Sequence, residues 1–153
     1  MEGQGPDERR LRRPFALGDP EVLRGRGRLR LLLDTHTFIW AADGRLDSHT
    51  RAAMEAADAV SVSAVTIWEI EIKRALGKLQ APEDVIECSD ESGYERLSIT
   101  SEHAREAGRL PLLHCDPFDR MLIAQARVEG MTLASADAAF RRYDVPVLNV
   151  THD

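Results

Sequence analysis

Short apolar runs alternate with amphipathic segments along most of the chain. The run 29–33 ends at Asp34 and is too short for a helix, which favours a strand buried on both faces. Similar short runs predict further strands at 60–62, 97–99, 131–134 and 145–148. Between them, the pattern predicts helices at 48–58, 63–76, 82–91, 101–109 and 117–129. Strands that alternate with helices indicate an α/β fold with a mostly parallel sheet, whose ligands are expected at the carboxyl ends of the strands.

Polar residues and helix breakers support several of these boundaries. Ser48 and Ser63 are suited to cap the helices that begin there. Pro117 suits the first turn of its helix, and Gly77 and Gly130 each follow the last turn of one. The capping residues therefore place these helix ends independently of the apolar pattern.

Residues 1–28 differ from the rest of the chain in composition. They combine Gly, Pro and Arg without helical or alternating periodicity, which predicts a mobile tail before a single domain at 29–150. Residues 1–30 carry a formal charge of +3 and residues 31–153 one of −9, which together give the net −6 of the chain. An acidic domain argues against a protein that binds nucleic acid through its overall electrostatic field.

The sequence lacks the usual features of a membrane protein or a disulfide-rich protein. The longest apolar run, 38–42, is far shorter than the ~20 residues that a membrane-spanning helix needs. Cys88 and Cys115 are too few and too unpatterned for a disulfide framework, which indicates ordinary thiols. We therefore expect a cytoplasmic protein with no membrane contact.

Four acidic residues are expected at or near the carboxyl edge of the sheet. Asp34 follows the first strand, Glu69 lies in the helix after the second, Asp119 begins a later helix, and Asp137 follows a later strand. Carboxylates that converge raise one another's pKa unless a hard divalent cation neutralises them. Each acid taken alone also fits a solvated helix cap or strand end, and Lys73 is placed to pair with Glu69 on the helix surface. Taken together, the four acids indicate a divalent metal site.

The segments that contain these acids resemble those of the PIN-domain ribonucleases and, within that family, those of the VapC-type toxins of bacterial toxin-antitoxin pairs. The resemblance runs from about Leu31 to Leu148, and its most specific block is 116–126. It is carried by LLLDTH at 31–36, SVSAVTIWEI at 61–70, ALGKL at 75–79, HCDPFDRMLIAQA at 114–126 and VPVL at 145–148. The resemblance implies a three-layer α/β/α fold with a small, mostly parallel sheet flanked by helices.

The resemblance also implies a site and an activity. Asp34, Glu69 and Asp119 match the three principal acids of the family. Asp137 matches the fourth, although Ser-Ala-Asp at 135–137 departs from the commoner Thr-Arg-Asp. These acids would bind Mg2+ or Mn2+ for hydrolysis of RNA phosphodiester bonds by a metal-activated water. The implied partners are an RNA substrate, a cognate antitoxin and a second copy of the chain in a homodimer.

Four further residues have an expected place near these acids. Thr35 and Ser63 match hydroxyl positions near the family's site. Asp116 is a competing carboxylate, which we interpret as the helix N-cap before Pro117. Arg120 could hold an RNA phosphate or one of the acids, and we expect an internal ion pair.

Other interpretations stay open on the sequence alone. His36, His114 and Cys115 lack the ligand spacing of a structural zinc site. Trp40 and Trp68 lie in apolar helical contexts, which favours packing in the core or in a dimer over stacking on bases. Because a sequence does not show that carboxylates meet in space, a non-catalytic α/β interaction module and a different metal-dependent phosphohydrolase remain as alternatives.

Overall fold

The computed structural model describes residues 28–153, so the tail predicted at 1–28 lies almost entirely outside the described residues. Within them, five strands form one sheet in the order β3-β2-β1-β4-β5, and every pair of neighbouring strands is parallel. The strands are β1 (Arg30–Leu33), β2 (Ala59–Ser63), β3 (Glu95–Leu97), β4 (Thr132–Ser135) and β5 (Val147–Asn149). The predicted parallel sheet is confirmed.

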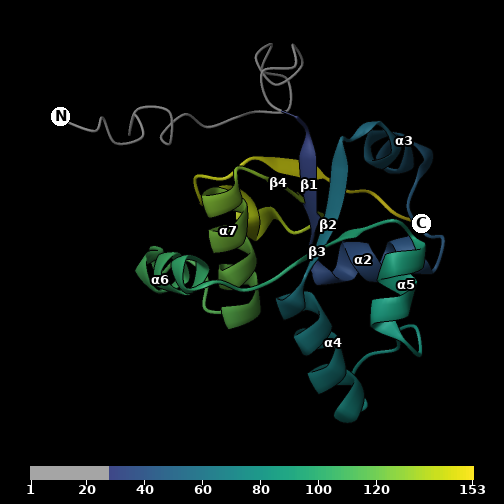
Figure 1. Ribbon diagram of the computed structural model, residues 1–153, viewed down its shortest axis with the longest axis horizontal. Helices are drawn as coiled ribbons and strands as arrows, with labels where there is room; N and C mark the ends of the chain where they lie inside the picture. Colours follow the sequence, from purple (N-terminus) through teal and green to yellow (C-terminus); the bar gives the residue numbers. More distant parts are fainter. Residues whose placement is uncertain (1–27) are drawn as a thin grey trace.

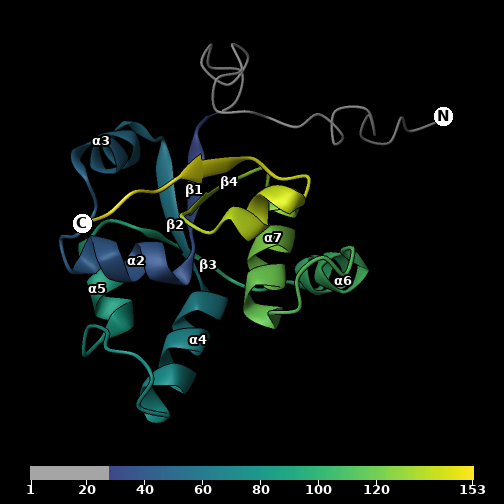
Figure 2. The same ribbon diagram turned by 180° about the vertical axis from the view of Figure 1, so that it is seen from behind.

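Helices cover both faces of this sheet. They are α2 (Thr35–Ala42), α3 (Ser48–Ala56), α4 (Ala64–Ala75), α5 (Val85–Glu91), α6 (Ser101–Arg109), α7 (Pro117–Glu129) and the short 3-10 helix η2 (Ala138–Arg142). Figures 1 and 2 show α6 and α7 on one side of the sheet, α2, α3 and α5 on the other, and α4 extending beyond the end of β2. The arrangement is the three-layer α/β/α fold that the sequence indicated.

The central strand β1 connects the two hydrophobic cores. Leu31, Leu32 and Leu33 are all fully buried. Because successive strand residues point to opposite faces, Leu32 joins the core that contains Leu122 of α7, and its two neighbours join the core that contains Phe38 of α2. The strand that ends at Asp34 is therefore held from both sides.

Two helical elements and several element boundaries differ from the sequence prediction. Helix α2 was not predicted, because it begins directly after Asp34 with no loop to separate it from β1. The 3-10 helix η2 was not predicted either. Strand β3 begins two residues before the predicted 97–99, and as a partly exposed edge strand it has little apolar pattern to mark it.

The helix caps largely follow the sequence interpretation. The Ser63 hydroxyl accepts a hydrogen bond from the backbone N–H of Val65 at 3.0 Å, which confirms it as the cap of α4. Gly130 ends α7 in the left-handed conformation, with φ +67, that favours glycine there. Helix α3 is capped by Asp47 rather than by Ser48, because the Asp47 carboxylate accepts the Thr50 N–H at 2.8 Å.

The sequence predicted no membrane-spanning helix and no disulfide framework. Across residues 28–153, the helices are too short or too polar for any of them to cross a bilayer. Cys88 and Cys115 are both free.

Candidate metal centre

Asp34 lies between β1 and α2, and a hydrogen bond from Ser135 ties it to the end of β4. Its side chain is buried, with Oδ1 accepting the Thr37 N–H at 2.8 Å and Oδ2 accepting the Ser135 hydroxyl at 2.5 Å. Burial raises the pKa of Asp34, and the hydrogen bonds from Ser135 and Thr37 oppose that increase. The carboxylate therefore has donors on both oxygens and little freedom to move.

Glu69 reaches the same region from the first half of α4. Glu69 is only 4% exposed, so the ordinary surface pair expected for Glu69 and Lys73 is wrong, although the ion pair itself forms through Oε2. The other oxygen, Oε1, accepts the Thr35 hydroxyl at 2.5 Å. The hydrogen bond with Glu69 raises the pKa of Lys73, and the carboxylates of Asp116 and Asp119 act in the same direction. Lys73 thus supplies one positive charge inside a group of acids.

Asp119 lies in the first turn of α7, after Pro117 at the start of the helix. Asp116 caps this helix by accepting the N–H groups of Phe118 and Asp119 at 2.8 and 3.1 Å, which confirms its interpretation as an N-cap. Burial raises the pKa of Asp119 to about 6, and the hydrogen bond with His114 opposes that shift. The nearby carboxylates of Asp116 and Glu69 raise the pKa of Asp119 further. At neutral pH Asp119 is therefore ionised in surroundings that disfavour its negative charge.

Asp137 completes the group from the loop after β4. It is exposed and caps η2, where Oδ1 accepts the Ala139 N–H at 2.9 Å. Its own N–H donates to Ser135 Oγ at 3.0 Å, so the Ser135 hydroxyl bridges Asp137 and Asp34. The serine that departs from the family pattern at 135 is the residue that makes this connection.

His114 is a member of the site that the sequence did not indicate. Its Nε2 lies 2.7 Å from Asp119 Oδ2, and single ligand atoms of His114, Asp119 and Asp137 lie within 4.8 Å of one another. In the sequence, His114 lacks the ligand spacing of a structural zinc site. A histidine five residues before a helix-initiating acid was the available clue, but its proximity to Asp137 depends on the tertiary fold.

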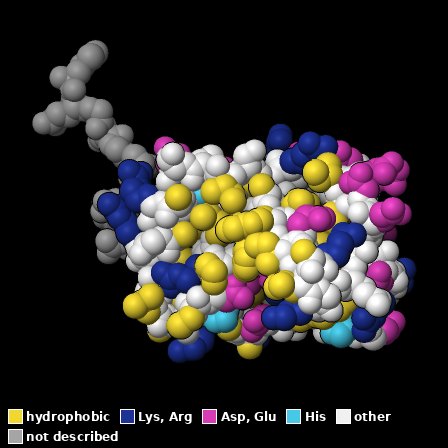
Figure 3. All heavy atoms as spheres, turned by 90° about the horizontal axis from the view of Figure 1, so that it is seen from below, with side chains coloured by type: hydrophobic (Ala, Val, Ile, Leu, Met, Phe, Trp, Pro, Cys, Tyr) yellow, Lys and Arg dark blue, Asp and Glu magenta, His cyan; other side chains and the backbone are white. Residues whose placement is uncertain are grey.

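The structure brings the four predicted acids to one edge of the sheet. Asp34 and Asp137 both form hydrogen bonds with Ser135. Single ligand atoms of Asp119, Asp137 and His114 lie within 4.8 Å of one another. The carboxylate of Glu69 is close enough to Asp119 to raise its pKa. Seen from below, toward the end of β1, hydrophobic side chains gather near the centre of the surface, with acidic and histidine side chains beside them (Figure 3).

Two accessory residues have structural roles that differ from expectation. The Ser63 hydroxyl donates to Gln125 Oε1 at 2.5 Å, so it links α4 to α7 instead of contacting the acids. Among the described residues, Arg120 forms no ion pair. Its guanidinium donates to the backbone carbonyl oxygens of Ala107, Leu110, Pro111 and His114. The expected internal ion pair is wrong, because the turn between α6 and α7 presents several carbonyls that need donors.

The two tryptophans differ in burial: Trp40 is partly buried and packs against the core that contains Phe38, whereas Trp68 lies outside the core. Trp68 is 58% exposed and meets Phe118 edge to face, with ring centroids 5.1 Å apart. Trp40 stacks on His152 with centroids 3.7 Å apart. The expectation of core packing is wrong for Trp68, and packing in a dimer stays a prediction. Trp68 and Phe118 directly precede Glu69 and Asp119, so their contact joins the two helices that carry those acids.

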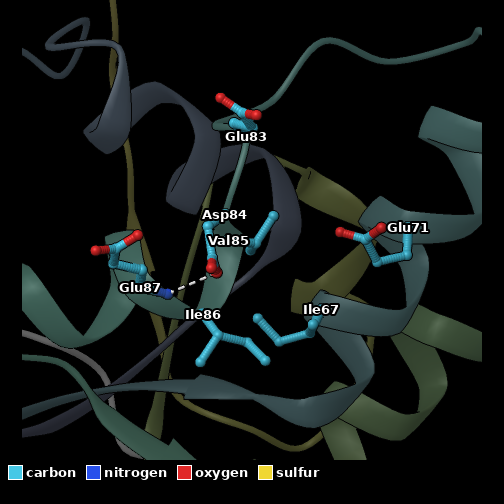
Figure 4. Close-up of a pocket in the computed structure, with 7 residues that line it drawn as sticks. All are labelled: Ile67, Glu71, Glu83, Asp84, Val85, Ile86 and Glu87. Carbon is cyan, nitrogen blue, oxygen red and sulfur yellow. Dashed lines mark hydrogen bonds between the residues drawn. The ribbon is translucent and has the colours of Figure 1, made fainter.

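A separate pocket of about 520 Å³ lies between α4 and α5 (Figure 4). Its floor is apolar and its rim is acidic. The lining residues are Ile67, Glu71, Glu83, Asp84, Val85, Ile86 and Glu87. Ile67 and Glu71 are each two residues from Glu69, which places this pocket on the opposite side of α4 from the acid cluster.

The sequence profile of the PIN domain family matches residues 31–146, which is more than half of the chain. The chain belongs to the PIN domain family. PIN domains are typically nucleases that depend on a divalent metal ion. A comparison with curated protein sequences finds no match.

Solved structures of toxin-antitoxin complexes contain chains with the same fold as this PIN domain. A chain of VapBC2 from Rickettsia felis, bound to a promoter DNA fragment, has a TM-score of 0.62 at 16% identity, covering 79% of this chain and 98% of that chain. DNA-bound VapBC from Salmonella typhimurium gives 0.61 at 20% identity, with coverage of 79% and 98%. VapBC-5 from Mycobacterium tuberculosis gives 0.55 at 20% identity, with the same coverage. At these identities the likeness establishes the fold.

The raised pKa of Asp119 leads to a prediction about stability. Its ordinary value is 3.8 and its value in the folded protein is about 6, so the folded state retains a proton that the unfolded state has lost between these pH values. Stability should therefore fall as pH rises through this range. In the metal-free PIN domain we expect Asp119→Asn, which cannot ionise, to be more stable than wild type above about pH 6, with the gain shrinking towards about pH 4.

Urea unfolding in EDTA at several pH values measures this effect. The control is Asp84→Asn, which changes the N-cap of α5 outside the cluster and should show no comparable gain. A wild-type protein that is more stable than Asp119→Asn at neutral pH would contradict the conclusion that the surroundings of Asp119 disfavour its ionised form.

Proposed function

We propose that this PIN domain is a metal-dependent ribonuclease and the toxin of a toxin-antitoxin pair. The observation that carries the proposal is the convergence of Asp34, Glu69, Asp119 and Asp137, which come from separate elements, at one edge of the sheet. Solvated helix caps have no reason to converge, and burial of Asp34 and Glu69 is costly. Both points favour a metal site over the non-catalytic interaction module.

The donor set fits a hard divalent cation. Carboxylate oxygens are the preferred ligands of Mg2+ and Mn2+, and a cluster with excess negative charge gains most from such an ion. Asp34, Glu69, Asp119 and Asp137 would hold it. When bound, a divalent ion supplies a water of lowered pKa as nucleophile and offsets the charge that develops on the phosphate.

The other residues of the site orient these carboxylates. Ser135 and the Thr37 N–H hold Asp34, while the Thr35 hydroxyl holds Glu69. The Lys73 ammonium neutralises part of the negative charge that would repel an RNA phosphate. The chain therefore holds Asp34 and Glu69 firmly and partly balances their charge before any ion binds.

The exposed indole of Trp68 favours a single-stranded RNA substrate over a small phosphate ester. It lies beside Glu69, and an exposed aromatic face can stack on a base without regard to sequence. A small substrate of the alternative phosphohydrolase would have no use for such a surface. This contact would position a nucleotide next to the acids, and it takes the place of the dimer packing that the sequence favoured for Trp68.

Substitution of the acids should separate the nuclease from its alternatives. Asp34→Asn and Asp119→Asn keep the side-chain size and remove a charged ligand, so RNA cleavage should fall by roughly two orders of magnitude or more. Asp116→Asn, which keeps a capping side chain, should have a smaller effect. Cleavage is measured on purified full-length protein with total RNA, and circular dichroism checks the fold of each variant.

Removal of the metal is the companion measurement. EDTA should abolish cleavage, and added Mg2+ or Mn2+ should restore it. The control Asp84→Asn, at a helix cap outside the cluster, should cleave at the wild-type rate. Activity that persists in EDTA, or a fully active Asp34→Asn variant, would refute the metal-dependent mechanism.

The pocket between α4 and α5 supports an antitoxin as partner. Its rim carries Glu71, Glu83, Asp84 and Glu87 around an apolar floor, and residues 31–153 carry a charge of −9. An amphipathic segment with Arg or Lys on one face and aliphatic side chains on the other would complement both features. The similar solved structures are complexes of toxins with antitoxins. We therefore include binding of a basic, amphipathic antitoxin segment in the proposal.

Charge reversal in this pocket tests the partner. Expression of the protein alone should arrest growth of its host, and co-expression of a small protein encoded next to it should restore growth and yield a co-purifying complex. Glu83→Lys combined with Glu87→Lys should weaken that complex, because it opposes the partner's charge. Glu95→Lys on β3 is the control and should leave the complex intact. Harmless expression together with no co-purifying neighbour would contradict the toxin role.

A further inference from the structure

The turn between α6 and α7 holds a nitrogen ligand next to the carboxylates. Arg120 donates to the His114 carbonyl at 3.3 Å and to the Pro111 carbonyl at 2.9 Å, so the backbone of this turn is fixed to α7. From this position the His114 imidazole brings Nε2 to 2.7 Å from Asp119 Oδ2. The side chain of His114 is 28% exposed, so part of it is open to solvent.

The acid cluster divides into two parts. Asp34 and Glu69, which have a partner on each oxygen, form the satisfied part, and Asp119 and Asp137, beside His114, form the open part. In the satisfied part, Asp34 accepts hydrogen bonds on both oxygens, and each oxygen of Glu69 has a partner in Thr35 or Lys73. In the open part, Asp119 is paired only with His114 among the described residues. An incoming cation displaces fewer protein contacts in the open part.

The open part contains three donors of two kinds. The Nε2 atom of His114 and one oxygen each from Asp119 and Asp137 lie within 4.8 Å of one another. Ligand atoms on opposite sides of one ion are separated by about 4.2 Å, twice a typical metal–oxygen distance of about 2.1 Å. The limit of 4.8 Å is close to this separation, so we expect one ion to reach all three atoms with little side-chain movement and to take the place of the proton between Nε2 and Oδ2.

The imidazole changes which ion this site prefers. Mg2+ takes oxygen ligands and releases its waters reluctantly, whereas an imidazole nitrogen is better matched by first-row transition metals. We propose that His114 is a metal ligand together with Asp119 and Asp137, and that this nitrogen makes the site selective for Mn2+ over Mg2+. The inference rests on the proposed function for the presence of an ion, and it adds a ligand and an order of preference.

Pulsed electron paramagnetic resonance of full-length protein loaded with Mn2+ tests the ligand directly. Nitrogen bonded to Mn2+ gives a characteristic modulation, which we expect in the wild type. His114→Gln should remove it, since glutamine keeps a polar side chain but offers Mn2+ no imidazole. The control His36→Gln replaces the histidine next to Asp34 and Thr35, and it should keep the modulation.

Calorimetric titration tests the selectivity without measuring cleavage. His114→Gln should lower the affinity for Mn2+ by about tenfold or more and change the affinity for Mg2+ much less. If His114 only orients Asp119, the affinities for both ions should fall together and the wild type should show no nitrogen modulation.

The outcomes for the two proposals are distinct. Bound Mn2+ without nitrogen coupling in a protein that cleaves RNA would overturn the role of His114 and support the nuclease. Nitrogen-coupled Mn2+ in a protein that cleaves no RNA would support the role of His114 and overturn the nuclease. Protein that leaves all Mn2+ free in solution would overturn both.

Discussion

The constraint on which the site depends is electrostatic repulsion among carboxylates held close together. Two unit charges about 4 Å apart repel by about 4 kcal/mol at the effective dielectric constant of a protein surface. The chain limits this repulsion with a donor for most of its carboxylate oxygens and with one ammonium group, that of Lys73. Asp119 is the carboxylate whose ionised form remains disfavoured, because burial and neighbouring carboxylates raise its pKa to about 6. A cation bound at Asp119 would therefore gain the most free energy from neutralising a carboxylate.

The scaffold holds the acids in place through a few connections. The three leucines of β1 fix Asp34 from both sides of the sheet, and the parallel order of strands places Asp137 after the neighbouring strand β4. Helices α4 and α7 supply Glu69 and Asp119, and the dipole of α7 favours the negative charge of Asp119 in its first turn. These connections are made mostly by local sequence and by burial, so the site is formed before any ligand arrives.

The sequence predicted the features that depend on local pattern. Strand β1, the Ser63 cap and the Asp116 cap each follow from residues within a few positions of one another. The four acids could be placed at one edge because the carboxyl ends of parallel strands meet there. Local patterns were sufficient because each of these features uses its own backbone neighbours.

Features that depend on tertiary contacts were missed or misjudged. The carbonyl partners of Arg120 include residues of α6 and of the turn after it, and the apolar neighbours of Trp68 in the sequence did not reveal that α4 leaves its indole exposed. His114 gains its significance from Asp137, which is 23 positions away along the chain. Helix α2 was hidden because it follows its strand with no intervening loop. Each of these depends on how elements pack, which apolar periodicity does not encode.

The most direct test of the metal centre is the location of Mn2+ by anomalous diffraction in crystals of the full-length protein. The acidic pocket between α4 and α5, rimmed by Glu71, Glu83, Asp84 and Glu87, offers a comparison of similar charge on the other side of α4. We expect an anomalous peak within bonding distance of carboxylate oxygens of Asp119 and Asp137. Peaks confined to the pocket between α4 and α5, with none at Asp119, would contradict a metal centre at the edge of the sheet.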